Sequence, residues 1–250
     1  MDAEHALFEI WRTAFAGPVP SGDYDTYRPG YPDEAVRWAL GGPFASLDVL
    51  DLGAGTGILT RALARSGHRV VAVDPSRSML ATLSGRLPGL DARVGTAEHI
   101  PLDDASVDAV VLGQAWHWVD PDAAGPEVAR VLRPGGWLGL LWNSRDSTVP
   151  WVCELYSVAG EPVRERGDAD DRPVVPGPFG SMEELVVDNP HVLPDATAVG
   201  RLAGTWSWVR TAPDPEGVMA AVVEVASRNT LADGSVSVPQ RTECFRLRRR

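Results

Sequence analysis

The chain has 250 residues, 44% of them hydrophobic, and a formal net charge of −11 at pH 7. This length suits one α/β domain, and the acidity argues against nucleic-acid binding, which needs a basic face. The only two cysteines, Cys153 and Cys244, argue against a disulfide framework or a metal site, and no apolar run approaches the roughly 18 residues of a membrane span.

Composition adds further expectations. The N-terminus lacks a basic segment followed by an apolar one, so we expect a cytoplasmic protein. We expect no membrane partner, and a monomer or a homodimer. All 23 basic residues are arginine, which excludes a catalytic lysine. The arginines at 246 and 248–250 are best explained as the solvated end of a final strand.

The first predicted elements form a cofactor loop. Residues 47–52 are apolar on both faces, as in a parallel strand buried between helices. Gly53, Gly55 and Gly57 follow, where a backbone without Cβ turns tightly and approaches a ligand. Residues 58–65 carry apolar side chains at helical spacing and stop before Ser66-Gly67. A strand, a glycine loop and a helix in this order predict a nucleotide-cofactor site.

The next predicted strand, residues 69–74, ends in an acid 21 positions after Gly53. Rossmann-type folds place an acid about 20 residues past the first glycine, where it accepts hydrogen bonds from ribose hydroxyls. Asp74 is therefore the ribose candidate. The dinucleotide fingerprint needs glycine at position 58, which is Ile58, so a pyrophosphate is the weaker alternative.

Several motifs together resemble one family. The glycine loop between Asp51 and Asp74 resembles motifs I and II of the class I S-adenosylmethionine-dependent methyltransferases. Residues 95–108 resemble the family's adenine-binding turn and the approach to its fourth strand, and residues 131–136 the turn into its fifth. Residues 24–32 and 114–120 are similar to small-molecule methyltransferases grouped with trans-aconitate methyltransferase.

The resemblance implies S-adenosyl-L-methionine as cofactor, S-adenosyl-L-homocysteine as its product and a small-molecule acceptor, with oxygen the favoured acceptor atom. It places Arg28 near the methionine carboxylate, which a guanidinium can bind through two parallel hydrogen bonds. Many relatives have Asp where this chain has Thr96, so contact to the adenine amino group would fall to backbone near Ala97 or to a weaker hydroxyl. The cofactor-binding residues it implies are Tyr24, Tyr27, Arg28, Asp51, Gly53, Ala54, Gly55, Gly57, Asp74, Pro75, Met79, Thr96, Ala97, Glu98 and Gln114.

Acceptor-side candidates follow the fourth and fifth strands. His117 stands where open α/β sheets place ligands, and we predict it as the catalytic residue, acting as a base or orienting the acceptor; the alternative is packing beside the cofactor. Trp116 and Trp118 either wall the pocket, where an aromatic face attracts a sulfonium, or belong to the core. Asn143 and Arg145 are candidates for a polar or anionic acceptor, although ordinary turn residues look the same.

Segments outside the core predict a lid and a cap. Residues 24–31 can fold over the cofactor, and we predict that they are mobile without it and ordered with it; a static loop is the alternative. Residues 151–200 look like an insertion that caps the substrate pocket, with a polar connection at 167–173. Trp151, Trp206 and Trp208 lie in or after this insertion and suggest an acceptor with an apolar body.

The predicted domain is single: a lid segment (1–45), a cofactor-binding core (46–150), a substrate cap (151–200) and a strand–helix–strand ending (201–250). In that ending, residues 205–209 alternate like a strand, 215–227 read as a helix and 241–247 as a last strand. The fold class is α/β, a Rossmann-like, seven-stranded, mostly parallel sheet with an antiparallel C-terminal strand and helices on both faces.

Methyl transfer needs few catalytic side chains, because the protein mainly aligns a nucleophile with the methyl group and excludes water. A hydroxyl of high pKa calls for a general base, whereas a carboxylate is already ionised at neutral pH. Two other functions stay open. One is a non-methylating reaction such as a cyclisation on the same fold and cofactor. The other is a non-catalytic cofactor-binding protein, against which the intact Asp51, glycines and Asp74 argue.

Overall fold

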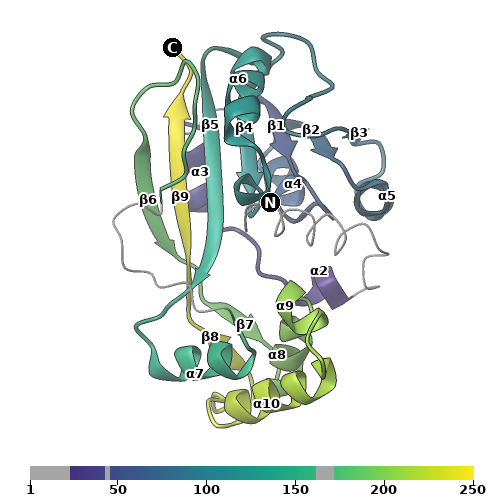
Figure 1. Ribbon diagram of the computed structural model, residues 1–250, viewed down its shortest axis with the longest axis vertical. Coiled ribbons are helices and arrows are strands. Elements are labelled where there is room, and N and C mark those ends of the chain that lie inside the picture. Colours follow the sequence, from purple (N-terminus) through teal and green to yellow (C-terminus); the bar gives the residue numbers. More distant parts are fainter. Residues whose placement is uncertain (1–22, 43–45, 162–171) are drawn as a thin grey trace.

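The computed structural model describes residues 23–42, 46–161 and 172–250, with side chains from residue 25 onward. Figure 1 shows an upper β-sheet flanked by helices and, below it, a smaller group of helices joined to the sheet by β5 (Leu132–Arg145) and β9 (Gln240–Arg248). Much of the predicted lid segment and of the 167–173 connection lies outside the described residues. None of the helices in the described ranges has the length and apolar character needed to cross a bilayer.

Within the described residues, seven strands form the main sheet in the order β3-β2-β1-β4-β5-β9-β6. The pairs from β3 to β5 are parallel, whereas β9 runs antiparallel to both β5 and β6. The predicted seven-stranded sheet with an antiparallel C-terminal strand is thus confirmed. The strands are β1 (Asp48–Leu52), β2 (Arg69–Asp74), β3 (Asp91–Val94), β4 (Val107–Gly113), β5 (Leu132–Arg145), β6 (Glu183–Asp188) and β9 (Gln240–Arg248).

Helices cover both faces of the sheet, so the central strands are apolar on both sides. On β1, Val49 packs with the core under α3 (Asp33–Ala39) and α4 (Ile58–Arg65), while the next residue, Leu50, packs with the core under α6 (Pro121–Val131). A short 3₁₀ helix, η1 (Trp116–Trp118), follows β4. The helices around the sheet are α2 (Asp23–Tyr27), α3 (Asp33–Ala39), α4 (Ile58–Arg65), α5 (Arg77–Arg86) and α6 (Pro121–Val131).

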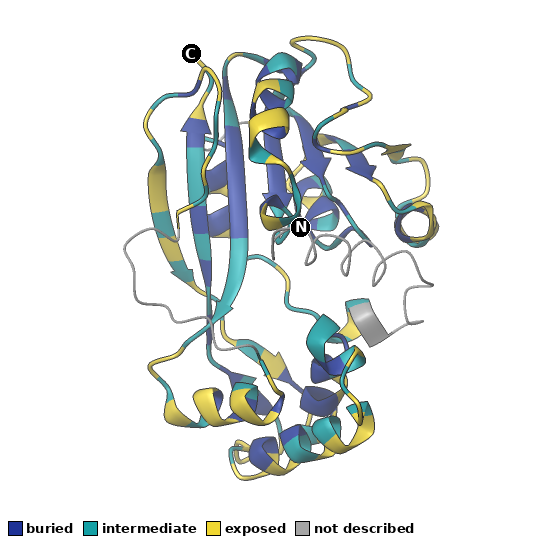
Figure 2. Ribbon diagram, in the orientation of Figure 1, coloured by how far each residue is buried: buried dark blue, intermediate teal, exposed yellow. Residues whose placement is uncertain are grey.

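The lower group of elements, which we name the cap, has a separate core. Its helices are α7 (Pro150–Val158), α8 (Ala196–Ala203), α9 (Ser207–Arg210) and α10 (Pro215–Ser227), beside the pair β7 (His191–Leu193) and β8 (Val236–Val238). Leu155, Val199 and Val222 are buried together in this core, and buried residues also mark the inside of the cap in Figure 2. Asp214 caps α10 by accepting from the Gly217 amide, and Pro215 occupies the first turn, as helix starts favour.

Two predictions for the C-terminal half are wrong. Residues 205–209 are not a strand, because α8 ends at Ala203 and the short helix α9 begins directly after Trp206. The alternating tryptophans instead stack, with the Trp206 and Trp208 ring centroids 5.2 Å apart. Residues 151–200 are not one insertion either, because they contain β6, which completes the main sheet beside β9.

Candidate cofactor and methyl-acceptor site

The glycine loop lies at the carboxyl end of β1 and depends on conformations that glycine tolerates best. Gly53, Gly55 and Gly57 have φ of 73°, 55° and 90°. A Cβ on Gly53 would lie 2.7 Å from the Ala115 Cβ, and one on Gly57 would lie 2.9 Å from the Leu83 Cγ. The Gly53 amide donates to the Val73 carbonyl at 2.8 Å, which ties the loop to β2.

Asp74, at the carboxyl end of β2, is buried beside this loop. Its Oδ2 accepts from the Gly55 amide at 2.8 Å and its Oδ1 from the Ser76 amide at 2.7 Å. Burial raises the pKa of Asp74, and these two amides oppose the rise. Each oxygen keeps a further lone pair for a hydroxyl donor. Nearby, Met79 is buried in α5, and Pro75 is exposed.

Asp51 is the buried acid directly before the loop, 1% exposed. Its Oδ2 accepts from the Thr60 hydroxyl at 2.5 Å, while its Oδ1 has no hydrogen-bond partner among the described residues. Burial, with a smaller contribution from the charge of Asp74, raises the pKa of Asp51 to about 7. A buried carboxylate oxygen without a donor calls for a ligand that supplies one. The amino group of S-adenosylmethionine is such a donor, so the residues present fit this cofactor.

The predicted adenine turn lies between β3 and β4. Ala97 is buried, whereas Thr96 is exposed and pairs through its backbone with His99. The Glu98 carboxylate accepts from the Asp120 amide at 3.0 Å. Glu98 therefore braces the start of α6, and Ala97 is the member of the turn that faces the interior.

Gln114 directly follows β4 and has a left-handed conformation, with φ of 55°. Such a backbone costs a non-glycine residue on the order of 1 kcal/mol and often marks a functional site. The Gln114 Nε2 donates to the Asn143 carbonyl at 2.8 Å, which joins the loop after β4 to β5. Asn143 is itself engaged: its Oδ1 accepts from the Thr242 hydroxyl at 2.6 Å, and its Nδ2 donates to the Gly30 carbonyl at 3.0 Å.

The η1 residues divide between the core and the surface. Trp116 is 5% exposed, and its Nε1 donates to the Val174 carbonyl at 3.1 Å, which places it in the core. Trp118 is half-buried, and its ring centroid lies 4.0 Å from that of His117. His117 is exposed, and its Nδ1 accepts from the Trp142 Nε1 at 3.1 Å. Trp142, which the sequence analysis did not select, is thus the β5 residue that contacts the predicted catalytic histidine.

Arg145, at the end of β5, points toward the cap. It forms an ion pair with Glu161, and its guanidinium carbon lies 5.1 Å from the centroid of the Tyr156 ring. Tyr156 stacks on Trp206 with centroids 4.7 Å apart, and burial raises the pKa of Tyr156 to about 12. These contacts give Arg145 a role in joining the sheet to the cap, so any contact with the acceptor would compete with them.

The helix α2 contacts the glycine loop through Asp25, another residue that the sequence analysis did not select. The Asp25 carboxylate accepts from the Thr56 hydroxyl and forms ion pairs with Arg61 of α4 and Arg86 of α5. Its side chain is 6% exposed. Because Thr56 lies between two of the loop glycines, α2 sits directly against the predicted cofactor site.

The same short helix contacts the cap at its other end. The Arg28 Nε donates to the Thr205 hydroxyl and its Nη2 to the Thr205 carbonyl, both at 2.9 Å. His191 lies with its Nε2 2.7 Å from the Tyr27 carbonyl oxygen. The Tyr24 side chain lies outside the described residues. Arg28, predicted near the methionine carboxylate, is therefore held on the cap in this structure.

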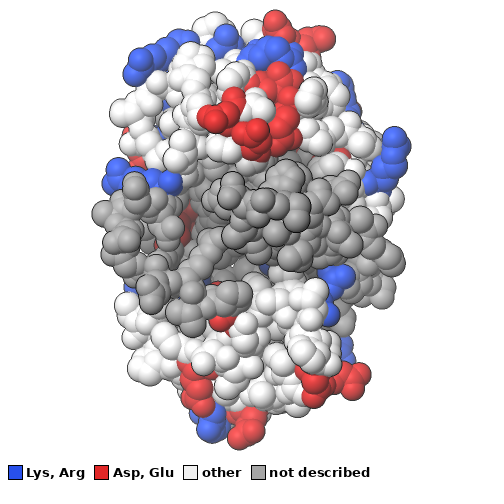
Figure 3. Space-filling model, viewed as in Figure 1, with Lys and Arg blue, Asp and Glu red and all other residues white. Residues whose placement is uncertain are grey.

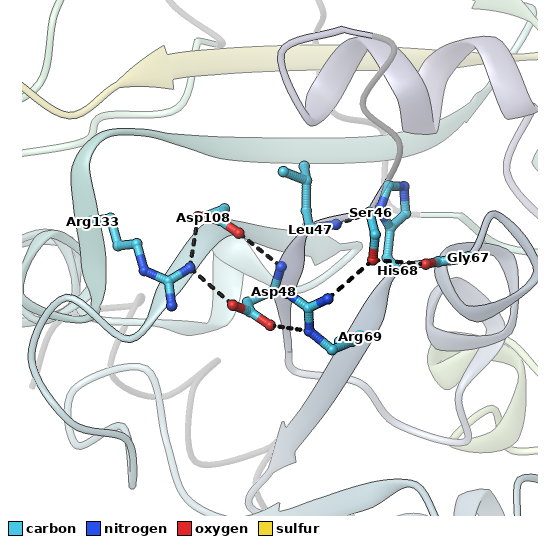
Figure 4. Close-up of polar contacts among 8 residues, drawn as sticks. All are labelled: Ser46, Leu47, Asp48, Gly67, His68, Arg69, Asp108 and Arg133. Atoms are coloured by element: carbon cyan, nitrogen blue, oxygen red, sulfur yellow. Dashed lines mark hydrogen bonds and ion pairs between the residues drawn. The ribbon is translucent and has the colours of Figure 1, made fainter.

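At the opposite, amino end of the strands is an ion-pair network (Figure 4). Asp48 pairs with Arg69 at 2.6 Å and with Arg133 at 3.0 Å, and Arg133 also pairs with Asp108 at 2.6 Å. Hydrogen bonds from the two arginines lower the pKa of Asp48. A cavity of about 510 Å³ adjoins this network. Since open α/β sheets bind ligands at the carboxyl ends of their strands, we assign the network to strand alignment.

Comparison with known proteins supports one family. A family model described as a methyltransferase domain matches residues 50–140. A methyltransferase of Mycobacterium tuberculosis, described as uncharacterized, is 54% identical over 167 residues, 67% of each chain. A ubiquinone/menaquinone biosynthesis C-methyltransferase of Rubrivivax gelatinosus is 38% identical over 155 residues, 53% of this chain and 61% of the relative. A solved structure from Anaeromyxobacter dehalogenans, provisionally assigned as a type II methyltransferase, has a TM-score of 0.62 at 26% identity, covering 88% of this chain and 96% of that one.

The chain therefore belongs to the class I S-adenosylmethionine-dependent methyltransferases. The narrower likeness to trans-aconitate methyltransferase stays a prediction. In the part of the chain that the structure describes, no three His, Cys, Asp or Glu side chains gather as a metal site.

Proposed function

We propose that this protein transfers a methyl group from S-adenosylmethionine to an oxygen atom of a small-molecule acceptor. The observation that carries the proposal is the buried, unpartnered Oδ1 of Asp51 beside the glycine loop and Asp74. When bound, S-adenosylmethionine supplies an electrophilic methyl group on its sulfonium. The side chains around the loop then bind and orient it and exclude water.

In this proposal each part of the cofactor meets a matching group. Asp51 holds the amino group, Asp74 accepts from the ribose hydroxyls, and the turn at Ala97 borders the adenine. Arg28 is the candidate for the methionine carboxylate, which would require it to leave Thr205. Gly53–Gly57 allow the close backbone approach that all these contacts require.

Oxygen is the proposed acceptor atom because polar side chains, His117 and Asn143 among them, follow β4 and β5 at the carboxyl edge of the sheet. Carbon is the alternative that the R. gelatinosus relative favours, since it is named a C-methyltransferase. A small acceptor with an apolar body agrees with the stacked Tyr156, Trp206 and Trp208 of the cap.

Calorimetry tests the cofactor half of the proposal. Asp74→Ala should weaken binding of S-adenosylhomocysteine about 10- to 100-fold, because hydrogen bonds to a charged group contribute about 1.5–3 kcal/mol. Asp91→Ala is the matched control, since Asp91 is an exposed aspartate at the start of the neighbouring β3. Equal affinity of the Asp74 variant and the wild type would contradict the assignment.

A panel of acceptors with isotopically labelled methyl donor tests the transfer. The panel holds aromatic and aliphatic carboxylates, phenols, amines and carbon acids, and mass spectrometry locates the label in each product. Label on oxygen, lost in the Asp74 variant, supports the proposal, and label on carbon or nitrogen replaces oxygen as the acceptor atom. Tight cofactor binding without transfer to any class favours the non-methylating alternative.

A further inference from the structure

The hydrogen bond between Trp142 and His117 determines which ring nitrogen of His117 carries the proton. An indole N–H can only donate a hydrogen bond, so the His117 Nδ1 that lies 3.1 Å from it must be the acceptor. A neutral imidazole with an accepting Nδ1 carries its proton on Nε2. We infer that Trp142 is a positioning residue that fixes the tautomer of His117, so that His117 acts as an Nε2 hydrogen-bond donor and not as a general base.

The sheet holds the indole in the orientation that this role needs. Trp142 pairs with Glu243 of β9, and its ring meets that of Phe245 edge to face, with centroids 5.7 Å apart and planes at 79°. Trp142 is half-buried against the main core, so its N–H direction follows from packing. A rigid donor of this kind can select one tautomer of a more exposed histidine.

The loop that carries His117 is held in the same way. Trp118 packs against the imidazole at an interplanar angle of 61°, and buried Trp116 anchors η1 in the core. Gln114, at the start of this loop, is tied to the β5 backbone one residue after Trp142. β5 thus contacts the loop through two adjacent residues, which fixes the ring of His117 relative to the carboxyl edge.

The tautomer of His117 determines which role its ring can have in methyl transfer. This part of the inference rests on the proposed function. A general base needs an imidazole lone pair, and the lone pair of the neutral ring is on Nδ1, where the indole uses it. Protonation at Nδ1 would set two N–H groups against each other and break the contact with Trp142. His117 is therefore suited to donate from Nε2 to an acceptor group that it orients.

Nitrogen-15 NMR of the histidine rings tests the inference without any acceptor. The chain has five histidines, and His117→Gln identifies the signals of His117. At a pH of about 8.5, where imidazoles are neutral, the wild type should show the proton of His117 on Nε2 alone. Trp142→Phe keeps an aromatic ring against Phe245 but removes the N–H, and should produce a mixture of tautomers.

The matched control is Trp118→Phe, which alters the neighbouring indole that packs on His117 and should leave the tautomer unchanged. A wild-type ring protonated on Nδ1, or a Trp142→Phe ring that keeps the wild-type tautomer, would overturn the inference. The spectra of the other four histidines show whether each variant is folded. The result stands even if the proposed methyl transfer fails, so the two failures are distinguishable.

Kinetics with an accepted acceptor provide a second readout. Trp142→Phe should lower kcat/KM about 2- to 10-fold, mainly through KM, as expected for a misoriented hydrogen-bond donor. His117→Ala combined with Trp142→Phe should be no worse than His117→Ala alone, because Trp142 acts through His117. A kcat loss of about 10²–10⁴ in His117→Ala, with Trp142→Phe silent, would identify a general base and contradict the inference.

Discussion

At the scale of single residues, the environment of Asp51 has a consequence for stability. Burial raises the pKa of its carboxyl to about 7, whereas in the unfolded chain the group ionises near its ordinary value of about 3.9. The folded protein therefore favours the protonated acid. The stabilisation is fully present below about pH 4 and is lost as the pH rises to about 7.

As the pH rises from about 4 to above about 7, ionisation of Asp51 should lower the free energy of unfolding by up to ~4 kcal/mol. Asp51→Asn, which is neutral throughout, should remove that part of the pH dependence in urea unfolding. Asp91→Asn is the control, because Arg93 lowers the pKa of Asp91. The Asp91 carboxyl is therefore ionised above about pH 5 in both the folded and the unfolded chain. Parallel stability profiles for the wild type and the Asp51 variant would contradict the raised pKa.

Cofactor affinity should follow the same titration. If the ionised Asp51 binds the amino group, the free protein must lose a proton below about pH 7, so wild-type affinity should rise about tenfold from about pH 6 to about pH 8. Comparison with Asp51→Asn at each pH separates this effect from ionisation of the ligand. If Asp51→Asn binds the cofactor more weakly than the wild type by the same factor at both pH values, the negative charge of Asp51 does not contribute to binding.

At the scale of elements, α2 connects two parts of the molecule that sequence places far apart. Asp25 of α2 contacts the glycine loop, whereas Tyr27 at its end and Arg28 directly after it contact the cap. The predicted ordering of residues 24–31 by cofactor can be tested by hydrogen exchange of residues 25–31. We expect exchange to slow with S-adenosylhomocysteine.

Asp25→Asn should abolish that slowing and weaken the cofactor about 2- to 10-fold, as expected for the loss of a hydrogen-bonded ion pair. Asp33→Asn is the control, because Asp33 is exposed in the first turn of α3. Equal exchange with and without ligand would identify α2 as a static brace.

The packing of α3 on β5 allows a second test at this scale. A Cβ on Gly139 would lie 2.8 Å from the Ala39 Cβ and 2.9 Å from the Ala39 carbonyl oxygen. Gly139→Ala should therefore cost about 1–3 kcal/mol of stability. Gly85→Ala in α5 meets nothing within 4 Å and should stabilise by up to about 1 kcal/mol. If denaturant unfolding shows Gly139→Ala to be as stable as Gly85→Ala or more stable, the close packing of α3 on β5 is contradicted.

At the scale of the whole molecule, the sheet and the cap have separate cores. Trp206 is buried in the cap between Tyr156 and Trp208. Trp206→Ala should destabilise the cap by about 3–5 kcal/mol and speed amide exchange in α8 and α10, with little change in β1 and β4. Leu112→Ala in the sheet core is the comparison, and it should speed exchange throughout. Identical exchange patterns for the two variants would mean that the cap and sheet open as one unit.

The surface bears on the expectation that the protein does not bind nucleic acid. On the face shown in Figure 3, the arginines among the described residues lie apart from one another between acidic side chains and do not form a continuous basic stripe. With a net charge of −11, such a surface offers few sites for the counterion release that drives binding to phosphates. The expectation stays a prediction.

The sequence by itself determined several elements of the cofactor-binding core and one helix of the cap. The strand at residues 69–74 and the helices at 58–65 and 215–227 match the structure to the residue. Their signals are local: glycines with positive φ, a proline in a first helical turn and an apolar period within one element. The family resemblance rests on the same short motifs.

Only the tertiary structure decided the rest. β6 is a short edge strand whose place depends on its pairing with β9. The conformation of residues 205–209 is set by the stacked tryptophans of the cap and not by the local alternation of the sequence. Trp142 meets His117 across 25 positions, and Asp25 meets Thr56 across 31. Such pairs form because the sheet brings the ends of its strands together, and no local pattern of residues encodes that geometry.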